Sequence, residues 1–336
     1  MFVRKLACGW LVTVALSLRV LAAPAEPSSE KIAGKTAETK SPVLWKEPKD
    51  IASRNLFYGP GGKAHQPHGT FVFVKEDLDG TNPKFVIRDQ DGTKWKLKMG
   101  NEARPETVAS RITWAVGYYT NEDYFMPNMV IQGMPDHLHR GRKQVGPDGT
   151  VHDVRLKRDE GKKTGEWDWR SGPFAGTREL NGLRVVMALI NNWDLKNVNN
   201  AIYQDGSDSI YMVSDLGASF GSASRSWPKD KSKGNVESYQ HSKFLGKVTD
   251  GEVNFRTPAR PSLIYIVNPK EYFQRIHMES IGKNIPREDV RWIGEMLARL
   301  SPAQIRDAFR AGGYSPREIE VFSSILEKRI RLLTDL

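Results

Sequence analysis

Three oxygen-bearing side chains flank a short apolar run in the second half of the chain. Asp194 opens a polar loop, and Asn199 follows it five positions later. Asp215 comes directly after the apolar run IYMV and a serine, just before Leu216 and Gly217. Carboxylate and amide oxygens are hard ligands that suit Mg²⁺, and phosphoryl transfer depends mostly on positioning and charge neutralisation. The residue types therefore favour a magnesium site that serves phosphoryl transfer.

The elements around these residues are predictable from their patterns. Residues 177–190 carry apolar side chains at helical spacing, which predicts a buried helix that delivers the Asp194 loop. The run IYMV predicts a single strand that ends at the Asp215 turn. Each motif alone also fits an ordinary helix end or strand-to-turn junction. Residues farther upstream must therefore decide between these interpretations.

The upstream region predicts an antiparallel sheet followed by a helix. Residues 70–77, 84–89 and 94–100 alternate as strands and are separated by turns that contain glycine. A helix is predicted from Pro105 to a stop at Gly117. The runs MVIQGM and VHDVRLK are expected to complete the same sheet.

The first turn of this sheet has the sequence GTNPK and is a candidate phosphate-binding loop. Gly80 leaves backbone N–H groups accessible, and Thr81, Asn82 and Lys84 add polar side chains. Successive N–H groups around a glycine can hold an anion. The alternative is that this segment is simply a turn.

Two lysines lie on one face of the third strand. A lysine on a half-buried face would need an anionic partner, and Lys98 is nearer the strand end than Lys96. Glu106, in the first turn of the next helix, is the expected partner, with Glu102 as its rival. Alternatively, both lysines face water and Glu106 only complements the helix N-terminus.

This set of residues, in this order, resembles the protein-kinase-like superfamily over residues 70–221. The likeness is closer to the atypical branch of HipA-like toxin kinases and phosphatidylinositol-kinase-like proteins than to ordinary eukaryotic protein kinases. The chain lacks a G-x-G-x-x-G motif before the lysine strand and a His-Arg pair before Asp194, and Leu216 stands where phenylalanine is usual.

The resemblance implies an α+β, bilobal fold, with an antiparallel sheet and one helix in the N-lobe (57–170) and a mostly helical C-lobe (171–336). It implies ATP as the nucleotide, with Mg²⁺ or alternatively Mn²⁺. The implied roles are catalytic for Asp194 and Lys196, nucleotide-binding for the GTNPK loop, Lys98 and Glu106, and metal-binding for Asn199 and Asp215. A catalytically inactive module that binds an envelope or extracellular partner remains an alternative, as does nucleotidyl transfer.

The N-terminus predicts export. Residues 1–25 combine Arg4 and Lys5 with an apolar run and small residues near Ala23, which is typical of a secretory signal. The protein is then periplasmic or secreted and has no transmembrane helix after signal removal; an uncleaved anchor is the alternative. The single cysteine, Cys8, would be removed with the signal. Residues 26–56 predict a solvated, flexible linker.

Charge and the remaining segments suggest the kind of partner. The formal net charge of +10 favours an anionic partner besides the nucleotide, such as an acidic or phosphorylated protein or an envelope substrate, although it also fits a merely soluble basic surface. Residues 222–261 predict a long, basic loop, which the kinase resemblance implies is the place where substrates dock; the alternative is a solvated, mobile loop. Ser301 and Ser315 begin capping boxes of C-terminal helices. Export argues against a nucleic-acid partner.

Overall fold

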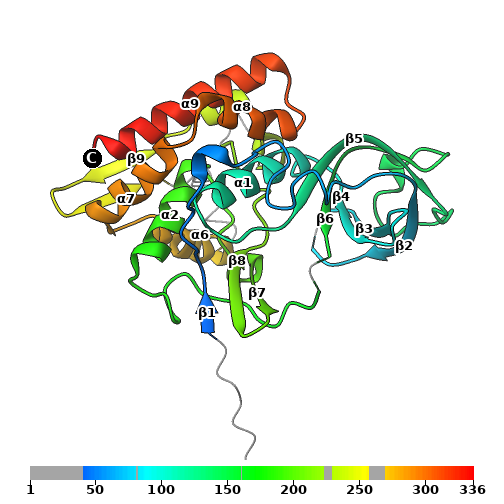
Figure 1. Ribbon diagram of the computed structural model, residues 1–336, viewed down its shortest axis with the longest axis horizontal. Coiled ribbons are helices and arrows are strands. Elements are labelled where there is room, and N and C mark those ends of the chain that lie inside the picture. The colour runs from blue at the N-terminus through cyan, green and yellow to red at the C-terminus, as the bar shows by residue number, and fades with distance from the viewer. Residues whose placement is uncertain (1–40, 81, 160, 223–228, 257–268) are drawn as a thin grey trace, which may run out of the picture. The chain divides into compact units, whose positions relative to one another are not determined.

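The computed structural model describes residues 41–80, 82–159, 161–222, 229–256 and 269–336, which fold as a mixture of helices and sheets (Figure 1). The expected α+β class is therefore confirmed at this level. All of these residues belong to one compact unit. Within the described residues, no helix is both long and apolar enough to span a membrane.

Five strands form a closed barrel in the first half of the chain. They are β2 (Phe71–Asp77), β3 (Lys84–Arg88), β4 (Lys94–Lys98), β5 (Asp123–Gln132) and β6 (Thr150–Arg158). The predicted meander and the two later strands are confirmed, in the order β2-β3-β4-β6-β5. The sequence pattern did not predict closure, which depends on a short parallel pairing of Phe71 with Ile131. Apolar side chains that include Phe85, Trp95 and Leu156 fill the interior.

Helix α1 (Ala103–Ala115) follows β4 after a short turn and packs against β5, β6 and α8 (Pro302–Ala311). It begins two residues before the predicted start at Pro105. The early start places Glu102 at the N-cap and Glu106 in the first turn. Both carboxylates consequently lie close to the end of β4.

Helix α2 (Arg178–Leu189) is confirmed, and Thr177 caps it by accepting a hydrogen bond from the Leu180 N–H. After η3 (Asn197–Asn199), the chain forms a hairpin of β7 (Asn200–Asp205) and β8 (Asp208–Val213). The expectation of a single strand between Asn199 and Asp215 was wrong. The missed signal is Gly206-Ser207, a two-residue hairpin turn that begins with glycine, in which Gly206 has φ +55°.

The residues just before the barrel correct another expectation. Strand β1 (Ser41–Val43) pairs in parallel with β8, and a short η1 (Ile51–Ser53) follows. Leu44, Ile51 and Leu56 are at most 2% exposed, so residues 41–56 are not a solvated linker. These apolar residues are widely spaced among polar ones and show no period, which is why the sequence did not reveal them. Residues 26–40 lie outside the described part of the chain, as does the predicted signal.

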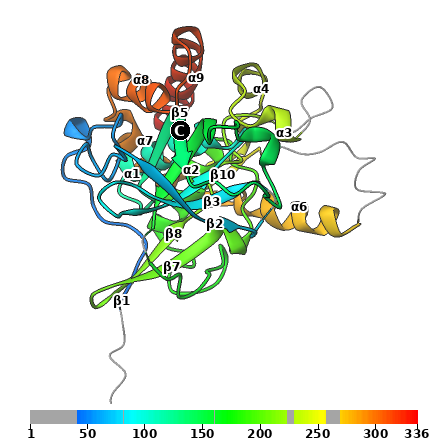
Figure 2. The same ribbon diagram turned by 90° about the vertical axis from the view of Figure 1, so that its right-hand side faces the viewer.

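The C-terminal part is mostly helical. Besides α8, it contains α6 (Pro269–Ile281), α7 (Arg287–Ala298) and α9 (Pro316–Thr334). The capping boxes at Ser301 and Ser315 are confirmed. Figure 2 views the chain from the barrel side, with α8 and α9 at the top and β7 and β8 at the bottom.

The segment predicted as a structureless basic loop is folded over its described residues 229–256. It contains α3 (Lys229–Ser232), α4 (Val236–Gln240), β9 (Leu245–Val248) and β10 (Glu252–Phe255). Strand β10 also pairs with β11 (Ile285–Pro286). Tyr239, Val253 and Phe255 are fully buried and anchor the segment. The buried apolar side chains are few and widely spaced among polar ones, so they did not form a recognisable period. Residues 223–228 and 257–261 of the predicted loop lie outside the residues that the structure describes.

Candidate functional site

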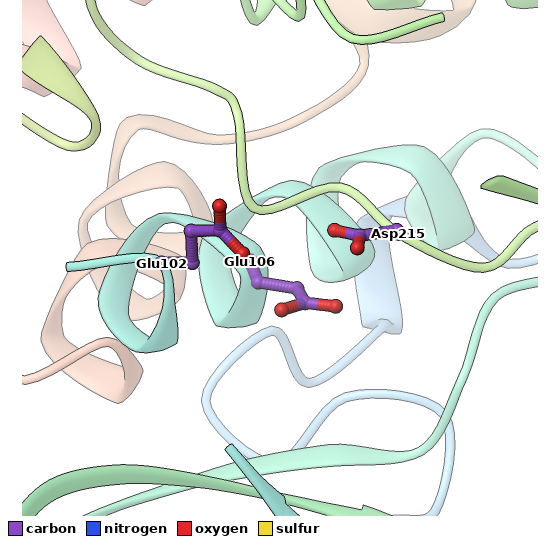
Figure 3. Close-up of side chains that lie close together, drawn as sticks. All are labelled: Glu102, Glu106 and Asp215. Carbon is purple, nitrogen blue, oxygen red and sulfur yellow. The ribbon is translucent and has the colours of Figure 1, made fainter. Parts of the chain in front are cut away.

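A buried lysine at the end of β4 joins three carboxylates. Lys98 Nζ lies 2.9 Å from Glu102 Oε2, 2.9 Å from Glu106 Oε2 and 3.2 Å from Asp215 Oδ1. Figure 3 shows the two glutamates on the first turn of α1 and Asp215 on the segment that follows β8. Lys98 is 6% exposed and therefore does not face water. The strand, the helix and the Asp215 turn thus meet at one ammonium group, which we call the Lys98 cluster: Lys98, Glu102, Glu106 and Asp215.

The second lysine of β4 has a different environment. The side chain of Lys96 is 39% exposed, and its Nζ lies 3.6 Å from Asp159 Oδ1. Lys98 is the last residue of β4, where the chain turns into α1, and so reaches the helix carboxylates. The position at the strand end therefore distinguishes the two lysines.

The charges of the cluster stabilise one another. Burial alone would lower the pKa of Lys98, but Asp215, Glu106 and Glu102 together raise it above its ordinary value. Burial would likewise raise the pKa of Asp215, but the Lys98 ammonium and the Gly217 N–H, 3.2 Å away, lower it. Both groups are therefore charged at neutral pH, and their attraction keeps Asp215 beside β4.

Two buried residues that sequence reasoning missed hold Glu106 in place. Arg155 Nη2 donates to Glu106 Oε1 at 2.9 Å, and Arg155 Nη1 lies 3.3 Å from Asp123 Oδ1. Arg155 pairs directly with Lys98 across β4 and β6. Each oxygen of Glu106 therefore meets a different cation, which fixes its orientation. Arg155 lies between Val154 and Leu156 in an alternating strand, a pattern that usually places a charge in solvent.

The Asp194 loop is tied to Asp215 through the backbone of the hairpin. The Asn199 carbonyl accepts hydrogen bonds from the Ser214 N–H at 2.8 Å and from the Asp215 N–H at 3.2 Å. Asn199 Nδ2 donates to the Asp194 carbonyl at 2.6 Å, and Lys196 Nζ lies 2.7 Å from Asp194 Oδ1. The hairpin thus brings Asp194, Lys196, Asn199 and Asp215 into one neighbourhood. The amide of Asn199 orients the loop backbone in this state.

The GTNPK loop reaches the Lys98 cluster through Asn82, whose Nδ2 donates to Glu102 Oε2 at 2.7 Å. Gly80 has φ +66°, a conformation that favours glycine. Lys84 Nζ lies 3.6 Å from Asp77 Oδ2, and these two residues form the strand pair next to the loop. Thr81 lies outside the described residues. Arg140, which the sequence did not single out, donates hydrogen bonds to the backbone carbonyls of Gly80 and Asp77 and so stabilises the loop.

A second lysine enters the cluster from the segment after the Asp215 turn. Lys233 Nζ lies 2.5 Å from Glu102 Oε1, and its side chain is 10% exposed. The sequence placed this residue among basic side chains that dock a substrate. In the structure it turns inward instead, toward the same glutamate that contacts Lys98 and Asn82.

The three carboxylates that converge on Lys98 are also candidate ligands for a hard metal ion. One oxygen each of Glu102, Glu106 and Asp215 lies within 4.8 Å of the others. Glu106 is held by two buried cations, whereas the Asp215 side chain is 42% exposed and accessible to a ligand. A separate cavity of about 760 Å³ is lined by residues that include Trp114, Tyr119 and Tyr203. Of the site residues that the sequence predicted and the structure describes, none lines this cavity. The Lys98 cluster therefore lies outside it.

Comparisons with known proteins give little further information. No protein-family model matches the chain, and no curated protein matches it. Among solved structures, the chain is similar to the Helicobacter pylori proinflammatory kinase CtkA, with a TM-score of 0.45 and 10% sequence identity. The match covers 79% of this chain and 96% of that chain. A likeness this distant does not assign the chain to a family.

Proposed function

We propose that this chain is a bilobal, kinase-like phosphotransferase that uses a magnesium nucleotide, most simply ATP, to phosphorylate a hydroxyl group. The observation that carries the proposal is the Lys98 cluster. A buried strand lysine contacts a glutamate of the following helix and an aspartate that follows a hairpin. The same arrangement holds nucleotide phosphates and metal in protein kinases. The N-lobe is 57–170 and the C-lobe is 171–336.

Each described residue has a role that its position supports. The Lys98 ammonium binds phosphate oxygens, and Glu106 keeps it oriented. Asp215 and Asn199 hold Mg²⁺, or Mn²⁺ as the alternative, and the metal ion neutralises charge on the phosphates. The GTNPK loop covers the phosphates with its backbone N–H groups and Asn82.

Asp194 acts on the acceptor. Its carboxylate orients the hydroxyl and takes its proton as the hydroxyl oxygen forms a bond to the terminal phosphorus. The bond between that phosphorus and the oxygen of the leaving nucleoside diphosphate breaks in the same step. Lys196 Nζ, 2.7 Å from Asp194 Oδ1, pairs with this carboxylate and offers a cation to the transferred group.

The acceptor is proposed to be acidic or phosphorylated, on a protein or an envelope component. Lys243 and Lys247 are exposed in the segment that follows Lys233 and can attract such a substrate. An inactive kinase-like module that binds an envelope or extracellular partner would keep nucleotide binding without transfer.

Thermal shift with nucleotides tests the central proposal. MgATP is expected to raise the unfolding temperature by a few degrees, because a ligand at a hundred times its Kd stabilises by about 2.7 kcal/mol. ATP with EDTA is the matched control and should have a smaller effect; GTP and Mn²⁺ complete the series. The proposal fails if no nucleotide, with either metal, changes the unfolding temperature.

Export is proposed on the basis of the N-terminal sequence alone. The protein recovered from the periplasm or the medium is expected to begin near Ala23 or Glu26, because small residues there would be recognised by a signal peptidase. Intact-mass measurement with N-terminal sequencing checks this. Recovery of an intact Met1 on cytoplasmic protein would contradict both the cleavage and the localisation.

A further inference from the structure

Glu102 collects hydrogen-bond donors from three separate segments. Its Oε2 accepts from Asn82 Nδ2 at 2.7 Å and from Lys98 Nζ at 2.9 Å, and its Oε1 lies 2.5 Å from Lys233 Nζ. These donors come from the GTNPK loop, the end of β4 and the segment after α3. Two ammonium groups and an amide that converge on one anion are the groups that proteins use to bind phosphate.

Glu102 is more exposed than its neighbour Glu106. Both oxygens of Glu106 meet buried cations from the barrel, and the side chain is 1% exposed. Glu102 stands at the N-cap position of α1, and its side chain is 13% exposed. It also packs closely over Gly217, where an added Cβ would lie 2.7 Å from the Cβ of Glu102. Glu102 therefore occupies the space beside the Asp215 turn, at the edge of the cluster.

The backbone that carries Lys233 is well anchored. Ser232 is fully buried, and the Gly234 N–H donates to the Ser219 carbonyl at 2.9 Å. Gly221 approaches this segment so closely that a Cβ there would lie 1.7 Å from the Ser232 carbonyl oxygen. The ammonium of Lys233 is thus delivered to the cluster by a fixed backbone.

The two lysines that could bind phosphate are already paired with carboxylates. Lys98 Nζ contacts Glu102, Glu106 and Asp215, and Lys233 Nζ contacts Glu102. An incoming phosphate must therefore displace a carboxylate from them. Arg155 fixes Glu106, and Asp215 is the proposed metal ligand, so Glu102 is the carboxylate left to move and free its donors.

We infer that Glu102 is an internal substitute for a nucleotide phosphate and that Lys233 is a second phosphate-binding cation beside Lys98. When a nucleotide binds, its phosphate takes over the bonds of Asn82, Lys98 and Lys233, and the Glu102 carboxylate turns toward solvent. The inference rests on the proposed function of the Lys98 cluster. It adds Lys233 as a phosphate-binding residue that the kinase resemblance does not provide. It also makes Glu102 a competitor of the phosphate, which weakens nucleotide binding to the free protein.

Calorimetric titration of wild type and four variants tests the inference, with MgATP and with inorganic tripolyphosphate as probes. Glu102→Gln is expected to bind both probes roughly tenfold more tightly, because the competing charge is gone. Lys233→Met is expected to bind both roughly tenfold more weakly, while Lys233→Arg keeps the charge and stays close to wild type. Lys94→Met removes an exposed lysine at the other end of β4 and should change nothing.

The outcomes separate this inference from the proposed function. If Glu102→Gln weakens binding, or if Lys233→Met binds like wild type, the inference is wrong even when wild type transfers phosphate from MgATP. If the variants shift tripolyphosphate binding as expected but no protein transfers phosphate to any acceptor, the inference stands and the enzymatic function fails. If no probe binds any of the proteins, both are wrong. Thermal melts without ligand confirm that each variant is folded. If Lys233→Met is not, Lys233→Gln replaces it and carries the same expectation of weaker binding, and Glu102→Gln still tests the competition.

Discussion

Lys98→Met is expected to abolish phosphoryl transfer and to weaken MgATP binding by roughly ten- to a hundredfold, since one hydrogen bond to a charged group is worth about 1.5–3 kcal/mol. The lost ammonium is the group at which Glu102, Glu106 and Asp215 converge. Isothermal calorimetry with MgATP and an assay of phosphorylated acceptor and ADP measure the two effects. Lys96→Met is the matched control, because Lys96 lies on the same strand but is half-exposed and pairs with Asp159. Equal losses in both variants, or none in either, would mean that the role of the strand has been misassigned.

The same variant should also be less stable. Without the ammonium, Glu106 keeps only Arg155 as a close cation among the described residues. Breaking a buried ion pair such as Lys98–Glu106 typically costs about 3–5 kcal/mol, and the Lys98–Asp215 pair adds less because the Asp215 side chain is 42% exposed and screened by solvent. Urea denaturation at neutral pH measures this difference in the free energy of unfolding. The nucleotide titration must therefore be made at a temperature at which the variant is folded.

The pH dependence of that stability difference has a definite sign. In wild type, the lowered pKa of Asp215 contributes stability that is present above the ordinary carboxylate pKa and is lost as the pH falls through the lowered value. The raised pKa of Lys98 contributes stability below the ordinary lysine pKa, so it is fully present from pH 4 to pH 7. In Lys98→Met the carboxylates lose their cation and their pKa values rise, so the variant takes up protons earlier. The gap between the two proteins should narrow as the pH falls from 7 toward 4, and a constant gap would contradict the electrostatic cause.

The second large effect separates the two acids. Asp215→Asn is expected to lose metal-dependent nucleotide binding and turnover together, because Asp215 is the accessible carboxylate beside Lys98. Asp194→Asn is expected to keep MgATP binding close to wild type and to lower the transfer rate by about 10²–10⁴-fold, the usual contribution of a general base. Calorimetry in MgCl₂ and in EDTA, combined with single-turnover kinetics, measures binding and chemistry separately.

Asp205→Asn, at the exposed tip of the same hairpin, is the matched control and should behave like wild type. If Asp215→Asn binds MgATP as well as wild type, the metal-binding role of Asp215 is wrong. If wild type binds MgATP but phosphorylates no acceptor, the binding site stands and the chain is an inactive kinase-like module.

The sequence predicted the elements that depend on local patterns. Alternation in residues 70–100 indicated three barrel strands, and the serine capping boxes located the two last helices. The order of Lys98, Glu106, Asp194 and Asp215 selected residues that the fold brings together. These residues were recognisable because each lies at the end of a predictable element.

The residues that the sequence missed are those whose meaning depends on tertiary contacts. Arg155 and Asp123 occupy strand positions that an alternating pattern usually assigns to solvent, and they are buried where α1 packs against β5 and β6. Lys233 lies far along the chain from Glu102, in a segment that reads as a basic loop. A local sequence period cannot indicate such long-range pairs. In addition, the sequence offered several plausible cation partners for each carboxylate of the cluster.

The pairing of β1 with β8 has a consequence for how the chain is synthesised (Figure 1). Ser41–Val43 and the apolar residues that follow leave the ribosome long before their partner strand exists. At about 5–20 residues per second, the chain between Val43 and Asp208 takes on the order of ten to thirty seconds to make. During that interval Leu44, Ile51 and Leu56 have no β8 hairpin or C-terminal helices to pack against. The barrel can fold meanwhile, but the first described strand must wait, so this short stretch is where a chaperone would be needed on the nascent protein.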